Sequence, residues 1–208
     1  MKETITRLKF YCDDDRCIDC NGCAVACDEA HELPIGIRRR RVITLNEGQI
    51  GKEISTSIAC MHCEDAPCAL VCPVDCFNIR ADGVVLHDKD MCIGCGYCLY
   101  ACPFGAPQFP RDTAFGVKGS MDKCTMCAGG VNIDTNSHDE FETYGQNRIA
   151  EGKVPVCAAM CSTKALLVGE SDIIEEIYQN RVNARGYGVK NLKDTPTWKI
   201  AYYKKDRL

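Results

Sequence analysis

The sequence lacks the features of several large classes of protein. None of its apolar runs approaches the roughly 18 residues that a membrane-spanning helix needs. Its net charge of −4 offers no basic excess for binding nucleic acid or an anionic membrane. The N-terminal segment MKETITRLKF has neither an apolar stretch nor paired arginines, so we expect no export signal and no membrane span.

Motifs for substrate chemistry are also missing. The sequence contains no glycine-rich nucleotide fingerprint, no nucleophile elbow and no zinc-type histidine motif. We therefore expect no catalytic residues in this chain, and any enzymatic activity would belong to a complex that contains it.

Cysteine, by contrast, is abundant, with 18 among 208 residues. Only disulfide frameworks, metal-rich proteins and cluster carriers use cysteine so densely. Two quartets have the spacing C-x2-C-x2-C-x3-C, one has C-x2-C-x4-C-x3-C, and the last is split by a long insertion. In chain order the quartets are Cys17, Cys20, Cys23 and Cys27; Cys60, Cys63, Cys68 and Cys72; Cys92, Cys95, Cys98 and Cys102; and Cys124, Cys127, Cys157 and Cys161.

The spacing favours iron–sulfur clusters over the other two chemistries. Thiols crowded into such short segments make a poor framework for long-range disulfides, which need paired Cα atoms about 4.4–6.8 Å apart. Zinc ribbons normally separate two C-x2-C knuckles by a dozen or more residues. A third cysteine two residues on, then a fourth before proline, is the ligand run of bacterial ferredoxins. Pro73 and Pro103 stand in that position.

In two-cluster ferredoxins the fourth cysteine of each run ligates the other cluster. The second and third quartets are neighbours in the chain, so we expect them to exchange ligands, and the first and fourth quartets to do the same. This predicts four [4Fe–4S] clusters, with the ligand sets Cys60, Cys63, Cys68 and Cys102; Cys92, Cys95, Cys98 and Cys72; Cys17, Cys20, Cys23 and Cys161; and Cys124, Cys127, Cys157 and Cys27.

The repeat predicts an α+β fold built from two ferredoxin-like modules. Short apolar segments at 8–11, 84–86 and 165–168 are typical of strands that flank the cluster loops. We expect an inserted module at 56–111, a discontinuous module formed by 1–55 with 112–170, and a C-terminal extension at 171–208. The extension should contain a helix capped by Ser171 and a strand at 198–203.

Several features lie outside this scheme. Residues 46–48 suggest a hairpin turn, and 128–156 suggest a polar surface excursion. The four arginines at 38–41 predict a solvated face, with a docking element for an acidic partner as the sharper alternative. Cys12 and Cys76 are expected to be buried, inert thiols rather than ligands. His62 is expected either beside a cluster or at the surface.

At this point a family is recognisable. The four-quartet order resembles the iron–sulfur electron-transfer subunits of molybdopterin oxidoreductases, as does the segment CDEAHELP at 27–34. The segments CPVDCF at 72–77, IGCGYC at 93–98 and CPFGAPQFP at 102–110 are similar to formate dehydrogenase beta subunits. The resemblance implies an electron relay that serves a large catalytic subunit with a molybdenum- or tungsten-bis-pterin site. A cytochrome or another acceptor subunit would take up the electrons.

Other functions are compatible with the same quartets. The partner could instead be a dimethyl sulfoxide, polysulfide or tetrathionate reductase or a hydrogenase, and the chain could also be a free polyferredoxin. The cytoplasm is the default location, with the periplasm as an alternative if a twin-arginine partner carries the folded subunit across the membrane.

Overall fold

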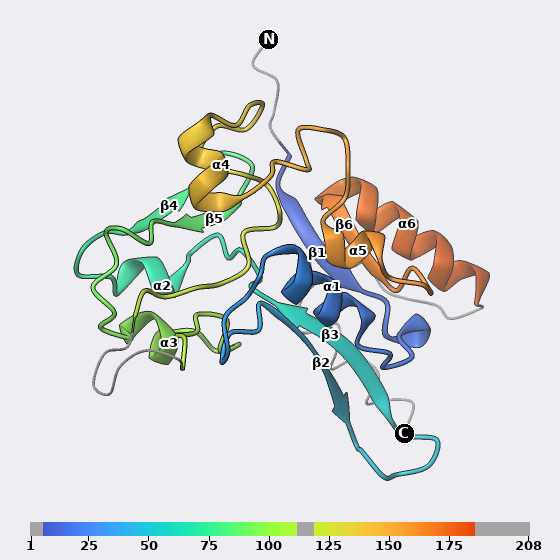
Figure 1. Cartoon of the computed structure of the whole chain (residues 1–208). Coiled ribbons are helices and arrows are strands. Elements are labelled where there is room, and N and C mark those ends of the chain that lie inside the picture. The colour runs from blue at the N-terminus through green and yellow to red at the C-terminus, as the bar shows by residue number, and fades with distance from the viewer. Residues whose placement is uncertain (1–5, 112–118, 186–208) are drawn as a thin grey trace.

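The computed structural model describes residues 6–111 and 119–185 as short helices and two-stranded sheets (Figure 1). The expected mixture of helices and strands in small sheets is confirmed. The elements are β1 (Leu8–Cys12), a 3-10 helix (Asp14–Arg16), α1 (Gly22–Ala30), β2 (Arg40–Leu45), β3 (Ile54–Ala59), α2 (Pro67–Leu70), β4 (Phe77–Ile79), β5 (Val85–His87), α3 (Tyr97–Ala101), α4 (His138–Tyr144), α5 (Val156–Ala159), β6 (Leu166–Glu170) and α6 (Ser171–Ala184).

The strands β1 and β6 pair antiparallel although they lie at opposite ends of the described chain. Leu8 stands opposite Glu170, and Cys12 stands opposite Leu166. This pairing brings the segment before the first cysteine quartet beside the segment after the last one. The strands expected around 8–11 and 165–168 are thereby confirmed to within two residues.

The middle of the chain forms its own small unit. The strands β4 and β5 pair antiparallel, and α2 and α3 lie on the same side of the molecule as this hairpin (Figure 1). The pair β1 and β6, with α1, α5 and α6, occupies the other side.

A second hairpin, β2–β3, projects from the body of the molecule (Figure 1). Its turn lies at the predicted place, where Asn46 and Gly48 have φ angles of 56° and 81°. Asparagine and glycine tolerate such left-handed backbone. At the base of the hairpin Arg40 stands opposite Ala59, and both side chains are buried.

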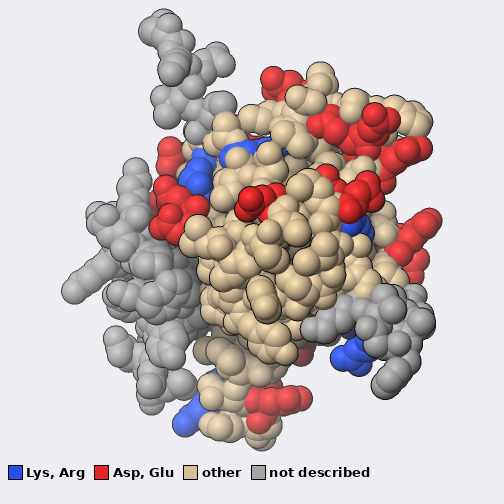
Figure 2. Space-filling view, turned by 90° about the vertical axis from the view of Figure 1, so that its left-hand side faces the viewer, with Lys and Arg blue, Asp and Glu red and all other residues tan. Residues whose placement is uncertain are grey.

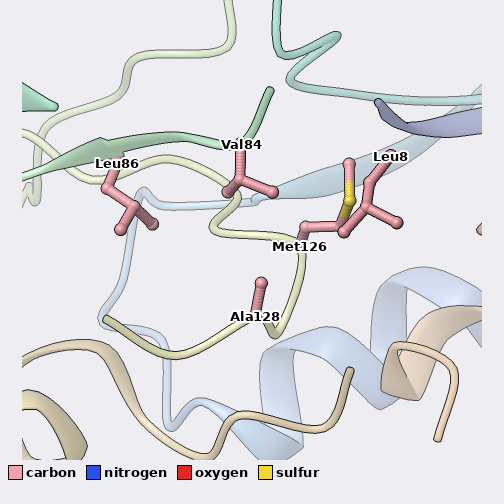
Figure 3. Packing of buried hydrophobic residues seen from close by; sticks show 5 residues of the cluster. All are labelled: Leu8, Val84, Leu86, Met126 and Ala128. Carbon is pink, nitrogen blue, oxygen red and sulfur yellow. The ribbon is translucent and has the colours of Figure 1, made fainter. Parts of the chain in front are cut away.

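One apolar core joins the two sides of the molecule. Figure 3 shows this core. Leu8 comes from β1, Leu86 from β5 and Val84 from the position just before β5. Met126 and Ala128 follow Cys124, the first cysteine of the fourth quartet. Burying a large apolar side chain contributes about 1.5–3 kcal/mol, so this small cluster is a substantial part of the contact.

The expected surface excursion at 128–156 therefore begins in the core. The buried Arg80 donates hydrogen bonds from Nη1 to the carbonyl oxygens of Ala128 (2.6 Å) and Gly130 (2.8 Å). Farther along, α4 is an exposed helix that begins with a capping box formed by Ser137 and Glu140. The excursion prediction is correct for α4 and wrong for its first residues.

The C-terminal helix α6 is present, but Ser171 is its first residue rather than its cap. Ile174 and Val182 are its buried residues. The buried carboxylate of Asp13 pairs with Arg181 at 3.4 Å and with Arg185 at 2.5 Å, which fixes the helix to the N-terminal strand. The strand expected at 198–203 lies outside the described residues.

The side of the molecule that carries α2 and α3 presents a broad surface with few charged side chains (Figure 2). The exposed apolar residues there include Leu70 and Tyr100, whose side chains are 81% and 83% accessible. Within residues 6–111 and 119–185, no helix is both long and apolar enough to cross a membrane.

Candidate iron–sulfur cluster sites

The first candidate site lies beside α2 and the segment that directly follows α3. Its cavity is lined by Cys60, Cys63 and Cys68 from the second quartet and by Cys102 from the third (the Cys60 set). The remaining lining is apolar except for the buried Lys123.

The second site uses the complementary ligands. Its cavity is lined by Cys92, Cys95 and Cys98 from the third quartet and by Cys72 from the second (the Cys92 set). Cys76 also lines this cavity, with its Sγ 3.5 Å from that of Cys72.

The third site joins the two ends of the chain. Cys17, Cys20 and Cys23 from the first quartet share a cavity with Cys161 from the last (the Cys17 set). Cys12 is part of the same cavity wall, and its sulfur accepts a hydrogen bond of 3.3 Å from the Ser57 amide.

The remaining quartet cysteines also gather, and all four are buried. They are Cys27 from the first quartet and Cys124, Cys127 and Cys157 from the last (the Cys124 set). Burial raises the pKa of the Cys27 thiol, and the neighbouring thiols of Cys124, Cys157 and Cys127 raise it further. The structure thus brings the sixteen quartet cysteines together in four groups, each drawn from two quartets.

The same backbone turn recurs in every quartet. The residue before the second cysteine has a left-handed conformation in all four, with φ of 55° at Asp19, 45° at His62, 68° at Gly94 and 61° at Met126. Aspartate and glycine adopt this conformation readily, whereas methionine does so rarely. Spacing alone did not reveal this turn. Its recurrence indicates that all four loops wrap around the same kind of group.

The arrangement discriminates between a cluster and a single metal ion. Among the described residues, which include every quartet cysteine, no three Cys, His, Asp or Glu side chains converge as ligands of one ion. Zinc, with Zn–S bonds of about 2.3 Å, would draw its four sulfurs around one point. Each of the three cavities is lined by four quartet cysteines. Four thiols around a hollow fit a [4Fe–4S] cluster better than zinc.

Burial raises the pKa of eight of the sixteen quartet thiols, which favours their protonated form unless a cation binds them. It raises the pKa of Cys68 and Cys98 to about 11 and that of Cys127 to about 12. Iron binding would displace these protons, since the thiolate is the ligand. Cys72 and Cys161 differ, because backbone amides that donate to their sulfurs outweigh burial and lower their pKa.

Two of the four consecutive arginines correct the sequence interpretation. Arg40 is 1% exposed, and the side chain of Arg39 is 9% exposed and pairs with Asp122, with Nε 2.5 Å from Oδ1. A solvated face or a docking element is therefore wrong for this pair. Arg38 is exposed, and half-buried Arg41 donates hydrogen bonds to the Phe104 and Gly105 carbonyls.

Three further residues lie in or next to the cavity walls. His62 is buried, so a surface position is wrong; its Nδ1 accepts a hydrogen bond of 3.0 Å from the Val85 amide. Cys76 is buried as expected, and Cys12 is half-buried. Both line cavities, which their positions in the sequence did not indicate. The wall at Cys12 forms only when β1 and β3 pack against the cluster loops, and the wall at Cys76 forms only when the second and third quartets meet.

Comparisons with known proteins agree with this geometry. Residues 52–171 match the model of the 4Fe-4S dicluster domain. The formate dehydrogenase iron-sulfur subunit of Wolinella succinogenes is 68% identical over 96% of this chain and 98% of its own length.

More distant relatives are subunits of other reductases. A subunit of the anaerobic dimethyl sulfoxide reductase of Escherichia coli is 34% identical over 80% of this chain and 75% of its own length. The thiosulfate reductase electron transfer subunit of Salmonella typhi is 35% identical over 77% and 74%. Together with the cysteine cavities, these matches show that the chain belongs to the 4Fe-4S dicluster family of iron–sulfur subunits and carries multiple [4Fe–4S] clusters.

Proposed function

We propose that this chain is the electron-transfer subunit of a formate dehydrogenase and carries four [4Fe–4S] clusters. The observation that carries the proposal is the gathering of sixteen cysteines into four groups of four, combined with 68% identity to a formate dehydrogenase iron-sulfur subunit. The Cys60, Cys92, Cys17 and Cys124 sets would each hold one cluster.

The same groups support a division into two modules. The Cys60 and Cys92 sets draw all their ligands from residues 56–111, which would form the inserted module. The Cys17 and Cys124 sets combine residues from 1–55 and 112–170, which would form the discontinuous module, closed by the pairing of β1 with β6. Residues 171–208 would form an extension, with α6 fixed to Asp13.

The apolar cores suggest the order of the clusters. Cys68 and Cys98 share one core, which connects the Cys60 and Cys92 sets. Cys60 and Cys124 share a second core, and Cys23 and Cys157 share a third. The order is therefore the Cys92 set, the Cys60 set, the Cys124 set and the Cys17 set.

The chemistry of the bound groups is one-electron transfer, which [4Fe–4S] clusters support over about −700 to +450 mV. The chain's own residues hold the clusters in sequence and exclude water from the middle of the path. The Cys124 set is wholly buried, whereas Cys20 in the Cys17 set is exposed. Electrons would enter at one end of this order and leave at the other.

Exposed apolar side chains lie near both ends. Tyr97 and Tyr100 of α3 lie near the Cys92 set, and Ile18 lies beside the Cys17 set. Exposed apolar surface of this kind marks protein–protein contacts. It favours a subunit with fixed partners over a free polyferredoxin. One partner would be the large molybdenum- or tungsten-bis-pterin subunit, and the other an acceptor such as a cytochrome.

The test is reduction by substrate in the complex. Formate should reduce the clusters within turnover when the large subunit is bound, and the isolated chain should not oxidise formate with a dye acceptor. If formate left the clusters oxidised while hydrogen reduced them, or dimethyl sulfoxide or thiosulfate reoxidised the reduced complex, another catalytic partner would replace formate dehydrogenase.

A further inference from the structure

Arg40 carries a fully buried positive charge. This residue begins β2 at the base of the projecting hairpin, and its side chain is among the largest fully buried ones. Within the described part of the chain no carboxylate forms an ion pair with it, and its Nε and Nη2 have no hydrogen-bond partner. An unpaired buried cation costs several kcal/mol. Some group must offset this cost.

The positive charge of the neighbouring Arg39, by contrast, is balanced by a carboxylate. Its guanidinium is bonded to the Asp122 carboxylate through Nε and Nη2, at 2.5 and 2.9 Å. Arg40 instead stacks over the ring of Phe10, 4.3 Å from the centroid. Phe10 packs against two apolar cores. One contains Cys23 and Cys157, and the other contains Cys124. Arg40 is thereby held at the junction of the Cys17 and Cys124 sets.

The anionic groups that face Arg40 are the cysteine sulfurs. Burial acts to lower its pKa, but Cys157, Cys124, Cys23 and Cys27, when they are thiolates, raise it overall. Cys23 belongs to the Cys17 set, and the other three belong to the Cys124 set. A cluster with four thiolate ligands is anionic, so two such clusters would supply the missing counter-charge.

Ser57 connects the guanidinium to one of these sulfurs. Arg40 Nη1 donates a hydrogen bond of 3.0 Å to Ser57 Oγ, and this oxygen lies 3.2 Å from Cys23 Sγ. Because Oγ accepts from the arginine, its single hydrogen is free to be donated to the sulfur. A hydrogen bond to a ligand sulfur is one of the main determinants of a cluster's reduction potential.

We propose that Arg40 is a positioning residue whose fixed positive charge raises the reduction potentials of the clusters in the Cys17 and Cys124 sets, with Ser57 directing part of this effect to Cys23. Adding one electron to either cluster increases its negative charge, and a nearby buried cation stabilises the reduced form. The clusters of the discontinuous module would thus accept electrons more readily than the cysteine ligands alone would allow. This inference rests on the four-cluster assignment proposed above.

The test is a redox titration followed by electron paramagnetic resonance on the full chain in its complex. In Arg40→Met, the equilibrium constants of two of the four one-electron reductions should shift at least tenfold toward the oxidised form. This lowers their midpoint potentials by about 59 mV. Arg40→Lys, which keeps the charge, should recover most of this shift. Ser57→Ala should move one step in the same direction. Arg38→Gln, which removes an exposed neighbouring arginine, is the matched control and should move none.

Iron content separates the two proposals. Fewer than four clusters in the unaltered chain would contradict the proposed function, whatever the variants do. With four clusters present, unchanged potentials in Arg40→Met, or equal shifts of all four, would overturn the role of Arg40. If Arg40→Met failed to assemble its clusters, Ser57→Ala would decide the matter, and unchanged potentials in that variant would overturn the proposal.

Discussion

Replacing Asp122 by asparagine should destabilise the protein by about 3 kcal/mol. The Asp122 side chain is 2% exposed, and it pairs with Arg39 at 2.5 Å and with Lys89 at 2.6 Å. Removing one partner of a buried ion pair costs about 3–5 kcal/mol, because the other charge stays buried without compensation. The charge of Arg39 would be left in this state, whereas Lys89 is partly exposed and can be solvated.

The pKa of Asp122 leads to a similar value for the loss of folding free energy. Burial acts to raise this pKa, but the hydrogen bond and charge of Arg39, followed by Lys89, lower it from 3.8 to about 2. At 1.36 kcal/mol per pKa unit, this difference corresponds to about 2–3 kcal/mol of folding free energy. A depressed carboxylate pKa stabilises the fold above pH 4, and this contribution is lost as the pH falls from about 4 to 2.

Anaerobic urea unfolding, followed by far-UV circular dichroism and the visible absorbance of the clusters, measures the effect. With an m-value of about 2–3 kcal/mol per M, the midpoint of Asp122→Asn should fall by about 1 M. The exposed Asp90→Asn is the matched control and should leave the midpoint unchanged. The double variant Arg39→Met with Asp122→Asn should regain part of the loss. An unchanged midpoint in Asp122→Asn would refute the argument that this buried ion pair stabilises the fold.

Three further predictions concern the clusters. Anaerobic analysis should find about 16 iron and 16 sulfide per chain, and stoichiometric zinc with little sulfide would contradict this. Cys161→Ala should remove the cluster of Cys17, Cys20 and Cys23, while Cys27→Ala should remove that of the Cys124 set. Iron content and electron paramagnetic resonance measure these losses. A loss confined to the sequence-local quartet would disprove the ligand exchange. Cys12→Ser and Cys76→Ser should keep the full iron content, and a loss of four iron atoms from either would make that cysteine a ligand.

Much of the fold could be predicted because its signals are local. The strands at 8–11 and 84–86 are short apolar segments, and the hairpin turn at 46–48 uses residues that tolerate left-handed backbone. The cysteine spacing predicted the cluster type for the same reason, since three ligands of the Cys60, Cys92 and Cys17 sets lie within one loop or one loop and its helix. The Cys124 set has only two ligands so close together in the chain.

The arginine run shows where local signals end. In a strand, alternate side chains point to opposite faces. Once residues 40–45 pair with β3, Arg40 and Val42 turn toward the core, whereas Arg38, which precedes the strand, stays exposed. Composition predicts that four consecutive arginines are solvated, because it contains no information about which face of the strand will be covered.

The sequence by itself determined the kind of group that the chain binds and which family it resembles, since both depend on cysteines a few residues apart. Tertiary structure decided which sets of cysteines are neighbours, why Cys12 and Cys76 line cavities, and where the buried charges of Arg40 and Asp122 lie. These properties depend on contacts between segments far apart in the chain, such as β1 with β6. They exist only after packing has placed an apolar core between the segments and removed water from their charges.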